Sequence, residues 1–468
     1  MIGQVLNRSA VVSQLPILAE DLRRVADGEV ERPAHGSDLT EAELREAAEL
    51  VERAAAHPAE VEELDAGAAR RAETPPIEDY AFIPRDAVTC IVQSSLEQFL
   101  RERHEERVQR VGGDESRRRG DEVPPVTDEY LDGDTYVEQS DGEQTRRLFG
   151  RFEIPTDPGW VSCLVAQGIR RWKGKQPFVD LPVRRELGGD VRLLLVGDWG
   201  SGLPRARRVS AEMRKVLMDG LDDGLEQHAV HLGDVYYSGF DYEYRDRFLA
   251  HWPVRPEEAG AITSWNLVGN HDMYSGGHGY FQVNLKDERF AGHEGCSYFE
   301  LANDDWTILC LDTGWEDGGL AGKQADWLEE RLADAGGRKS LLLSHHQLFS
   351  AYEHGAKTLR AKALPVLARH PVDGWIWGHE HRCMTFVATE GVGYGVCLGH
   401  GGVPVYQRHD EGKPVKAPGR YEYRAVIKKS LGLEPWAVFG FAVVDLKGSS
   451  ATVRYVNEFG TEYLSETF

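Results

Sequence analysis

Five short stretches of the chain carry side chains that can bind metal ions, and each stretch follows an apolar run. The stretches are GDWG, GDVYY, GNHD, SHHQ and GHEH. Their candidate ligands are Asp198, Asp234, Tyr237, Asn270, His345, His379 and His381. A carboxylate can bridge two cations, and imidazoles suit iron, zinc or manganese. Two cations about 3.5–4 Å apart can bind both the attacking oxygen and the phosphate of an ester. The set therefore predicts a dinuclear metal centre for phosphate-ester chemistry.

The elements that must position these side chains are short apolar strands. VRLLLV precedes the first stretch and SLLL the fourth, while helical sequences such as GKQADWLEERLADAG and a helical pattern from about Arg205 to Glu226 fill the intervals. This alternation predicts a mainly parallel α/β sheet, in which ligands bind beyond the carboxyl ends of the strands. We expect all five polar groups at one edge. A single strand-end aspartate is often only a turn or cap residue, so the interpretation depends on the ordered series.

The ordered series resembles the calcineurin-like metallophosphoesterase superfamily and, within it, the purple acid phosphatases. The wider superfamily usually has a histidine two positions after the first aspartate, where this sequence has Gly200. Purple acid phosphatases instead have a tyrosine three positions after the second aspartate, and Tyr237 stands three positions after Asp234. The resemblance therefore gives the ligand role to Tyr237 and leaves Tyr236 to packing. It runs from about Val191 to the C-terminus and offers nothing upstream.

The resemblance implies a four-layer α/β/β/α sandwich with two metal ions at the strand ends. It assigns Asp198, Tyr237 and His381 to the first metal, Asn270, His345 and His379 to the second, and Asp234 to both. In the family the first metal is Fe(III), and the second is Fe(II), zinc or manganese. His345 and His346 are alternative ligands, and the interval to the following EHG favours His345.

Further residues are candidates for the catalytic steps. The resemblance implies that His271 faces the substrate, where an imidazole stabilises phosphoryl oxygens or donates a proton. Asp272 would orient His271 or bond to its own loop. His354 in AYEHG matches a pocket histidine that protonates the leaving group, with a solvated loop residue as the alternative. His400 in CLGHGG replaces a small residue of the family and would narrow the pocket.

The sequence divides into four parts by composition. Residues 1–111 form a helical N-terminal region, in which Thr40 and Glu43 are spaced as a capping box for a helix between about Asp38 and Arg71. The other parts are an acidic linker or long loop at 112–150, a connecting segment at 151–189, and the metallophosphoesterase domain at 190–468. The N-terminal region could act as a lid or bind a protein partner.

Charge and cysteine content restrict the environment of the protein. The 468 residues carry a formal charge of −23, which repels nucleic-acid phosphates, so no nucleic-acid partner is expected. Bound cations can still attract a phosphate ester locally. The six cysteines form no CxxC pair, which favours thiols in a reducing compartment. No signal-peptide pattern and no apolar run of membrane-spanning length is present. We expect a cytoplasmic protein, with export left open.

The predicted function is metal-dependent hydrolysis of a small phosphorylated substrate, most simply a phosphomonoester. A phosphodiesterase acting on cyclic nucleotides or other small diesters is the alternative, because one metal core serves both reactions. A binding scaffold that has lost its chemistry is the alternative of another class, although such scaffolds typically lack ligands. Ferric iron is harder to keep in a reducing cytoplasm, so zinc, manganese or a diferrous pair stays open.

Overall fold

The computed structural model describes residues 8–30, 39–56, 87–98, 158–403, 415–426 and 437–468. The chain forms two compact units. Unit 1 comprises Met1–Glu62 and Glu73–Arg171, and unit 2 comprises Glu63–Ala72 and Trp172–Phe468. The acidic segment expected at 112–150 lies outside the described residues. Among the helices that are described, none has the length and apolar character needed to cross a membrane.

Unit 1 is helical where it is described. Its helices are α1 (Arg8–Ala26), α2 (Glu41–Ala56), residues 87–98 and α7 (Pro158–Lys173). The capping box is confirmed, since the Thr40 N–H donates to Glu43 Oε2 at 2.8 Å and the Glu43 N–H donates to Thr40 Oγ1 at 3.2 Å. These bonds satisfy N–H groups that the start of α2 would otherwise leave without partners.

Unit 2 contains two sheets. The eight-stranded sheet has the order β1-β5-β6-β7-β8-β10-β9-β11, and the six-stranded sheet has the order β14-β13-β12-β2-β3-β4. The strands of the larger sheet are β1 (Val183–Glu186), β5 (Phe299–Ala302), β6 (Trp306–Cys310), β7 (Lys339–Ser344), β8 (Val372–Trp377), β9 (Cys383–Phe386), β10 (Val392–Leu398) and β11 (Gly419–Glu422). Those of the smaller sheet are β2 (Val191–Val196), β3 (Glu226–His231), β4 (Ile262–Asn266), β12 (Gly440–Lys447), β13 (Ser450–Asn457) and β14 (Glu462–Thr467).

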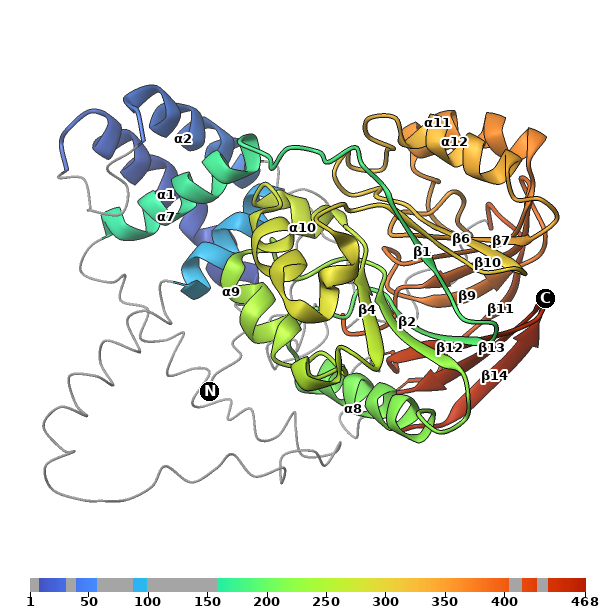
Figure 1. The fold of residues 1–468 in the computed structure, drawn as a ribbon. Helices are drawn as coiled ribbons and strands as arrows, with labels where there is room; N and C mark the ends of the chain where they lie inside the picture. Colours follow the sequence, from blue (N-terminus) through green and yellow to red (C-terminus); the bar gives the residue numbers. More distant parts are fainter. Residues whose placement is uncertain (1–7, 31–38, 57–86, 99–157, 404–414, 427–436) are drawn as a thin grey trace, which may run out of the picture. The chain divides into compact units, whose positions relative to one another are not determined.

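Helices cover the outer faces of both sheets. The α-helices are α8 (Pro204–Asp219), α9 (Asp241–Glu243), α10 (Asn270–Tyr274), α11 (Gln324–Ala333) and α12 (Lys357–Arg369). Shorter 3₁₀ and π segments are η4 (Tyr244–Leu249), η5 (Pro256–Glu258), η6 (Gly279–Val283), η7 (Asn284–Lys286) and η8 (Glu288–His293). α8 packs on the six-stranded sheet, and α11 and α12 lie against the eight-stranded sheet (Figure 1). The predicted four-layer α/β/β/α sandwich is therefore confirmed.

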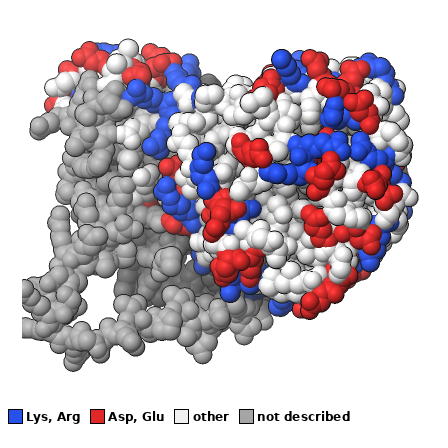
Figure 2. Space-filling view, viewed as in Figure 1, with Lys and Arg blue, Asp and Glu red and all other residues white. Residues whose placement is uncertain are grey.

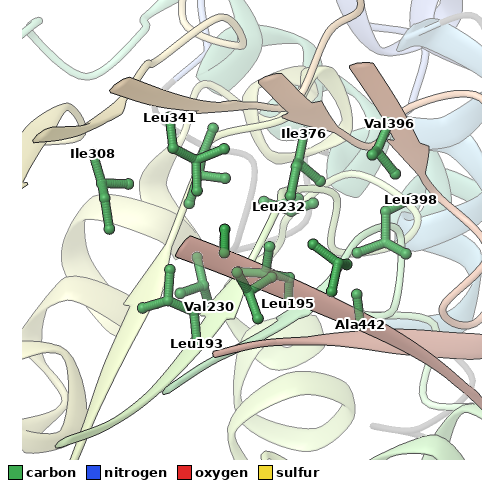
Figure 3. Packing of buried hydrophobic residues seen from close by; sticks show 14 of the residues in the cluster. Leu193, Leu195, Val230, Leu232, Ile308, Leu341, Ile376, Val396, Leu398 and Ala442 are labelled. Atoms are coloured by element: carbon green, nitrogen blue, oxygen red, sulfur yellow. The ribbon is translucent and has the colours of Figure 1, made fainter. Parts of the chain in front are cut away.

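The core between the sheets explains why the strands are so apolar. Leu193 and Leu195 on β2 face Leu341 on β7 and Ile376 on β8 (Figure 3). Every residue of β2 is buried, because the other sheet covers one face and α8 covers the opposite one. Strands buried on both faces appear in sequence as continuous apolar runs. The surface is different in character, and Figure 2 shows acidic and basic side chains interspersed over its visible face.

The strand topology corrects one expectation. β2, β3 and β4 are parallel neighbours in one sheet, whereas β7 and β8 are parallel neighbours in the other. The five polar stretches therefore come from two facing sheets and not from one edge. The reason is that β7 is hydrogen-bonded to β6 on one edge and to β8 on the other. It therefore cannot also pair with β2. Strand β1, from the segment expected to be a connection, pairs with β5.

Replacing a leucine of this core should destabilise unit 2. Leu193→Ala removes a fully buried side chain, and we expect a loss of about 2–5 kcal/mol in the free energy of unfolding. Urea unfolding followed by tryptophan fluorescence measures this, because all tryptophans except Trp160 lie in unit 2. Leu181→Ala is the matched control at a side chain 76% exposed and should change stability by less than about 0.5 kcal/mol. Equal effects of the two substitutions would contradict the assigned core.

Candidate metal centre

Two buried aspartates form the middle of the site. Asp198 follows β2 and Asp234 follows β3, and their side chains are 0% and 1% exposed. Both have positive φ, 55° and 76°, a conformation that non-glycine residues rarely adopt. Gly269, before α10, packs against the Asp234 carboxylate, where an added Cβ would collide with Oδ1. The loop before α10 can approach Asp234 only because Gly269 has no side chain.

A tyrosine hydroxyl joins the two aspartates, and it belongs to Tyr236. This hydroxyl lies 2.9 Å from Asp198 Oδ1, 3.2 Å from Asp234 Oδ2 and 3.1 Å from His381 Nε2. The prediction gave the ligand role to Tyr237 and a packing role to Tyr236. The structure corrects the role of Tyr236, whose buried ring carries its hydroxyl into the cluster of candidate ligands.

Hydrogen bonds in the loop after β3 fix the backbone of the two tyrosines. The buried Glu243 carboxylate accepts hydrogen bonds from the backbone N–H groups of Tyr237 and Ser238. Arg247 donates to the Tyr236 carbonyl at 2.6 Å, and its guanidinium lies 5.1 Å from the centre of the Tyr237 ring. Glu243 and Arg247 thus fix the backbone on both sides of the tyrosine pair. Neither residue was a sequence candidate, because neither belongs to a recognisable motif.

The opposite sheet supplies imidazoles to the same cluster. His345 follows β7 and is fully buried, and its Nδ1 lies 2.9 Å from the Leu232 carbonyl oxygen. Its Nε2 lies 3.1 Å from Asn270 Oδ1, 3.3 Å from Asp234 Oδ2 and 3.2 Å from His379 Nδ1. The Asn270 amide is oriented by its Nδ2, which donates to the Tyr274 hydroxyl at 2.7 Å. The Asn270 oxygen therefore faces the cluster.

This donor set fits a cation. The Leu232 carbonyl can only accept, so Nδ1 of His345 carries a proton and Nε2 is the nitrogen that would bind a cation. Nε2 faces a carboxylate oxygen, an amide oxygen and a second imidazole nitrogen, and a single proton cannot satisfy them all. Burial lowers the pKa of His345, but the charges of Asp234 and Asp198 outweigh it and raise the pKa to about 9. The site attracts positive charge strongly, as a metal site must.

Ligand atoms of two residue groups lie close enough to share an ion. Within each group these atoms lie within 4.8 Å of one another, and the groups are Asp198, Asp234 and His345, and His345, His346 and His379. His346 has other contacts: its Nδ1 lies 3.1 Å from Thr313 Oγ1 and its Nε2 lies 3.3 Å from Asp317 Oδ1. His345, in contrast, contacts Asn270 and Asp234. These contacts favour His345 as the ligand of the pair.

His271 and Asp272 follow Asn270 on α10 and are both buried. The His271 N–H donates to Asp234 Oδ1 at 3.0 Å, and its Nδ1 lies 2.7 Å from the Tyr237 carbonyl oxygen. Asp272 does not hold that imidazole, contrary to one expectation. Its carboxylate accepts the backbone N–H groups of Asp234 at 3.0 Å and Val235 at 2.9 Å. As in the alternative expectation, Asp272 also bonds to its own loop, because its Oδ2 accepts the Gly269 N–H at 2.7 Å.

Two other histidines lie in different surroundings. His354 is exposed, and its backbone carbonyl accepts from Gln347 Nε2 at 3.2 Å. His400 is buried, and its Nε2 lies 3.0 Å from the hydroxyl of Tyr463 on β14. Burial lowers the pKa of His400 to about 3, so the ring is neutral. His400 therefore packs against β14.

Comparisons with known proteins show the family to which the chain is similar. Residues 191–383 match the calcineurin-like phosphoesterase family. Human tartrate-resistant acid phosphatase type 5 is 31% identical over 304 residues, covering 58% of this chain and 88% of the relative. The rat protein of the same name is 27% identical with the same coverage. Among solved structures, GAP50, the anchor in the inner membrane complex of Plasmodium, has a TM-score of 0.41 at 14% identity, over 60% of this chain and 88% of GAP50.

The chain belongs to the calcineurin-like phosphoesterase family, and the resemblance noted in the sequence is confirmed. It is a phosphoric ester hydrolase. The family match spans residues 191–383, a range that includes every candidate ligand from Asp198 to His381.

The two adjacent tyrosines give a direct test of the site. Tyr236→Phe removes the hydroxyl that joins Asp198, Asp234 and His381, and we expect metal affinity to fall by about tenfold or more. Tyr237→Phe is the matched control and should keep the metal. Elemental analysis and the visible absorption spectrum of both purified variants measure this. Metal loss in Tyr237→Phe alone would instead support the assignment made from the family pattern.

Proposed function

We propose that the chain hydrolyses phosphate monoesters at a dinuclear metal centre. The observation that carries the proposal is the convergence of the buried carboxylates of Asp198 and Asp234 with imidazoles from the opposite sheet. The proposed ligands are Asp198, Tyr236 and His381 for the first cation, Asn270, His345 and His379 for the second, and Asp234 for both. The proposed metals are Fe(III) with Fe(II), zinc or manganese, supported by the similarity to the type 5 acid phosphatases.

Bound cations would activate a water molecule and neutralise the charge that develops on the phosphoryl group. The residues of the chain supply the remaining functions. Asp234 supports both metal positions because its Oδ2 faces His345 at 3.3 Å and Tyr236 at 3.2 Å. Its Oδ1 is already bonded to the backbone of His271, which fixes the orientation of the carboxylate.

His271 is the proposed contact to the substrate phosphoryl oxygens. Its Nδ1 donates to the Tyr237 carbonyl, and its Nε2 lies 3.9 Å from Asp234 Oδ2. Burial lowers the pKa of His271. Phosphoryl oxygens accept hydrogen bonds, so Nε2 must carry a proton to contact them, and the negative charge of a bound phosphate would favour that protonated form. His354, at an exposed position, is the proposed donor of a proton to the leaving oxygen.

Two alternative functions would use the same fold. A phosphodiesterase would use the same ligands, and chromogenic monoester and diester substrates distinguish the two activities. A silent scaffold would bind metal and hydrolyse neither substrate class.

The proposed location is the cytoplasm, supported by a cysteine pattern that contains no CxxC pair. A protein partner for the helical unit 1 is a further proposal, and a chain beginning near Trp172 would test whether catalysis needs that unit.

Removing the shared carboxylate should abolish both metal binding and turnover. In Asp234→Ala we expect the metal content to fall close to zero and hydrolysis to fall to background, since both cations lose a ligand. Elemental analysis and a p-nitrophenyl phosphate assay measure the two quantities, and circular dichroism checks the fold. Asp222→Ala, at an exposed aspartate after α8, is the control. An Asp234→Ala variant with full metal content and activity would exclude the proposed centre.

The two proposed proton-handling histidines should differ in their dependence on the leaving group. His271→Ala should lower kcat by about 10²–10⁴-fold for every monoester while the metal content stays unchanged. His354→Ala should slow alkyl phosphates far more than p-nitrophenyl phosphate, because nitrophenolate departs without protonation. The measurement is kcat for ethyl phosphate and p-nitrophenyl phosphate in each variant. Equal losses for both substrates in His354→Ala would remove that residue from the proposed role.

A further inference from the structure

The cluster of candidate ligands is open on the side of its last two histidines. His379 and His381 are partly exposed, whereas the other candidate ligands are buried. A substrate that binds the candidate ligands would reach them most directly from this side. The ring of His346 lies 4.6 Å from the ring of His379, centre to centre, and the Nε2 of His346 lies 3.3 Å from a carboxylate oxygen of Asp317. Asp317 thus stands beside the open side of the cluster.

The loop after β6 holds Asp317 in this place. The buried Asp312 carboxylate accepts the backbone N–H groups of Gly314 at 3.1 Å and Trp315 at 2.8 Å. The Gly318 N–H donates to the Thr313 carbonyl at 2.9 Å, which closes the loop on both sides of Asp317. A loop fixed by several backbone hydrogen bonds can present a side chain in one position. The backbone around Asp317 is therefore fixed, and its carboxylate lies 3.3 Å from His346 Nε2.

The Asp317 carboxylate is charged and mostly exposed. Its side chain is 75% exposed, and an exposed aspartate is ionised near neutral pH. The neighbouring lysines have other partners: Lys362 pairs with Glu316 at 3.0 Å, and Lys175 donates to the Trp315 carbonyl at 3.0 Å. Within the described part of the chain, His346 is the ion-pair partner of Asp317. The carboxylate therefore keeps most of its negative charge available to a bound molecule.

We infer that Asp317 determines substrate specificity by favouring phosphate monoesters whose leaving group carries a cationic amine over those whose leaving group carries a second anion. This inference rests on the proposed monoesterase function. The metal centre would attract the phosphate of every substrate equally, whereas Asp317 acts on the part of the substrate beyond the phosphate. An ammonium group near the carboxylate is attracted, and a carboxylate or further phosphate is repelled. Amino-alcohol phosphates are the chemical class that fits.

Three substrates of nearly equal size separate charge from shape. Phosphoethanolamine, ethyl phosphate and phosphoglycolate have two-carbon leaving groups that are cationic, neutral and anionic. In the wild type we expect kcat/KM to decrease in that order. Asp317→Asn keeps the shape and an oxygen that can accept from His346, and it should lower the ratio of kcat/KM for phosphoethanolamine over phosphoglycolate by about tenfold. The value for ethyl phosphate should change by less than about twofold, because no charge on that leaving group meets Asp317.

Controls make the result specific to Asp317. Asp334→Asn changes another exposed aspartate, on α11's C-terminal side and 63% exposed, and should leave all three values unchanged. Raising the salt concentration should reduce the wild-type ratio, because exposed charges are screened, and should leave that of Asp317→Asn almost constant. An unchanged ratio in Asp317→Asn, with ethyl phosphate still hydrolysed, would overturn this inference alone. A metal-loaded wild type that hydrolyses none of the three would overturn the proposed monoesterase function and the inference together.

Discussion

The site depends on the burial of two carboxylates, Asp198 and Asp234, at the ends of adjacent parallel strands. Both touch the hydroxyl of Tyr236, so two negative charges lie close together in a part of the protein that water does not screen. Such a pair is costly unless positive charge or protons compensate for it. One hydroxyl proton can serve only one carboxylate at a time. The imidazoles that end β7 and β8 supply the remaining partners, and that requirement links the two sheets at this end of the sandwich.

Other buried carboxylates make this arrangement possible by binding backbone. Asp272 accepts N–H groups from Asp234, Val235 and Gly269, and the Tyr244 hydroxyl donates to it at 2.6 Å. Burial and the charge of Asp234 raise the pKa of Asp272 to about 7. These bonds hold the loop in which Asp234 has its positive φ, a conformation that would relax without them. These buried polar groups therefore hold the candidate ligands in position through hydrogen bonds to the loop backbone.

The sequence predicted the strands well, because β2 and β7 are apolar runs that end in polar residues. It could not predict that they belong to different sheets, since an apolar run does not specify its hydrogen-bonding partner. The helix expected to continue to Glu226 ends at Asp219, where Gly220 caps it and Glu226 already begins β3. The tyrosine pair could not be resolved from spacing alone. Which ring enters the cluster depends on bonds from Glu243 and Arg247, and these residues carry no motif of their own.

The loop after β6, which belongs to one sheet, contacts loops that belong to the other sheet beside the site. Gly314 packs against the carbonyl oxygen of Gly269, which an added Cβ would meet, so the β6 loop and the loop before α10 are in direct contact. Trp315 Nε1 donates to the Gln176 carbonyl at 2.8 Å, and the Gln176 N–H donates to the Gly276 carbonyl at 2.8 Å. Gln176 thus bridges the loops on either side of the candidate centre. The geometry of the cluster therefore depends on residues before β1. These residues belong to unit 2, which includes the chain from Trp172 onward.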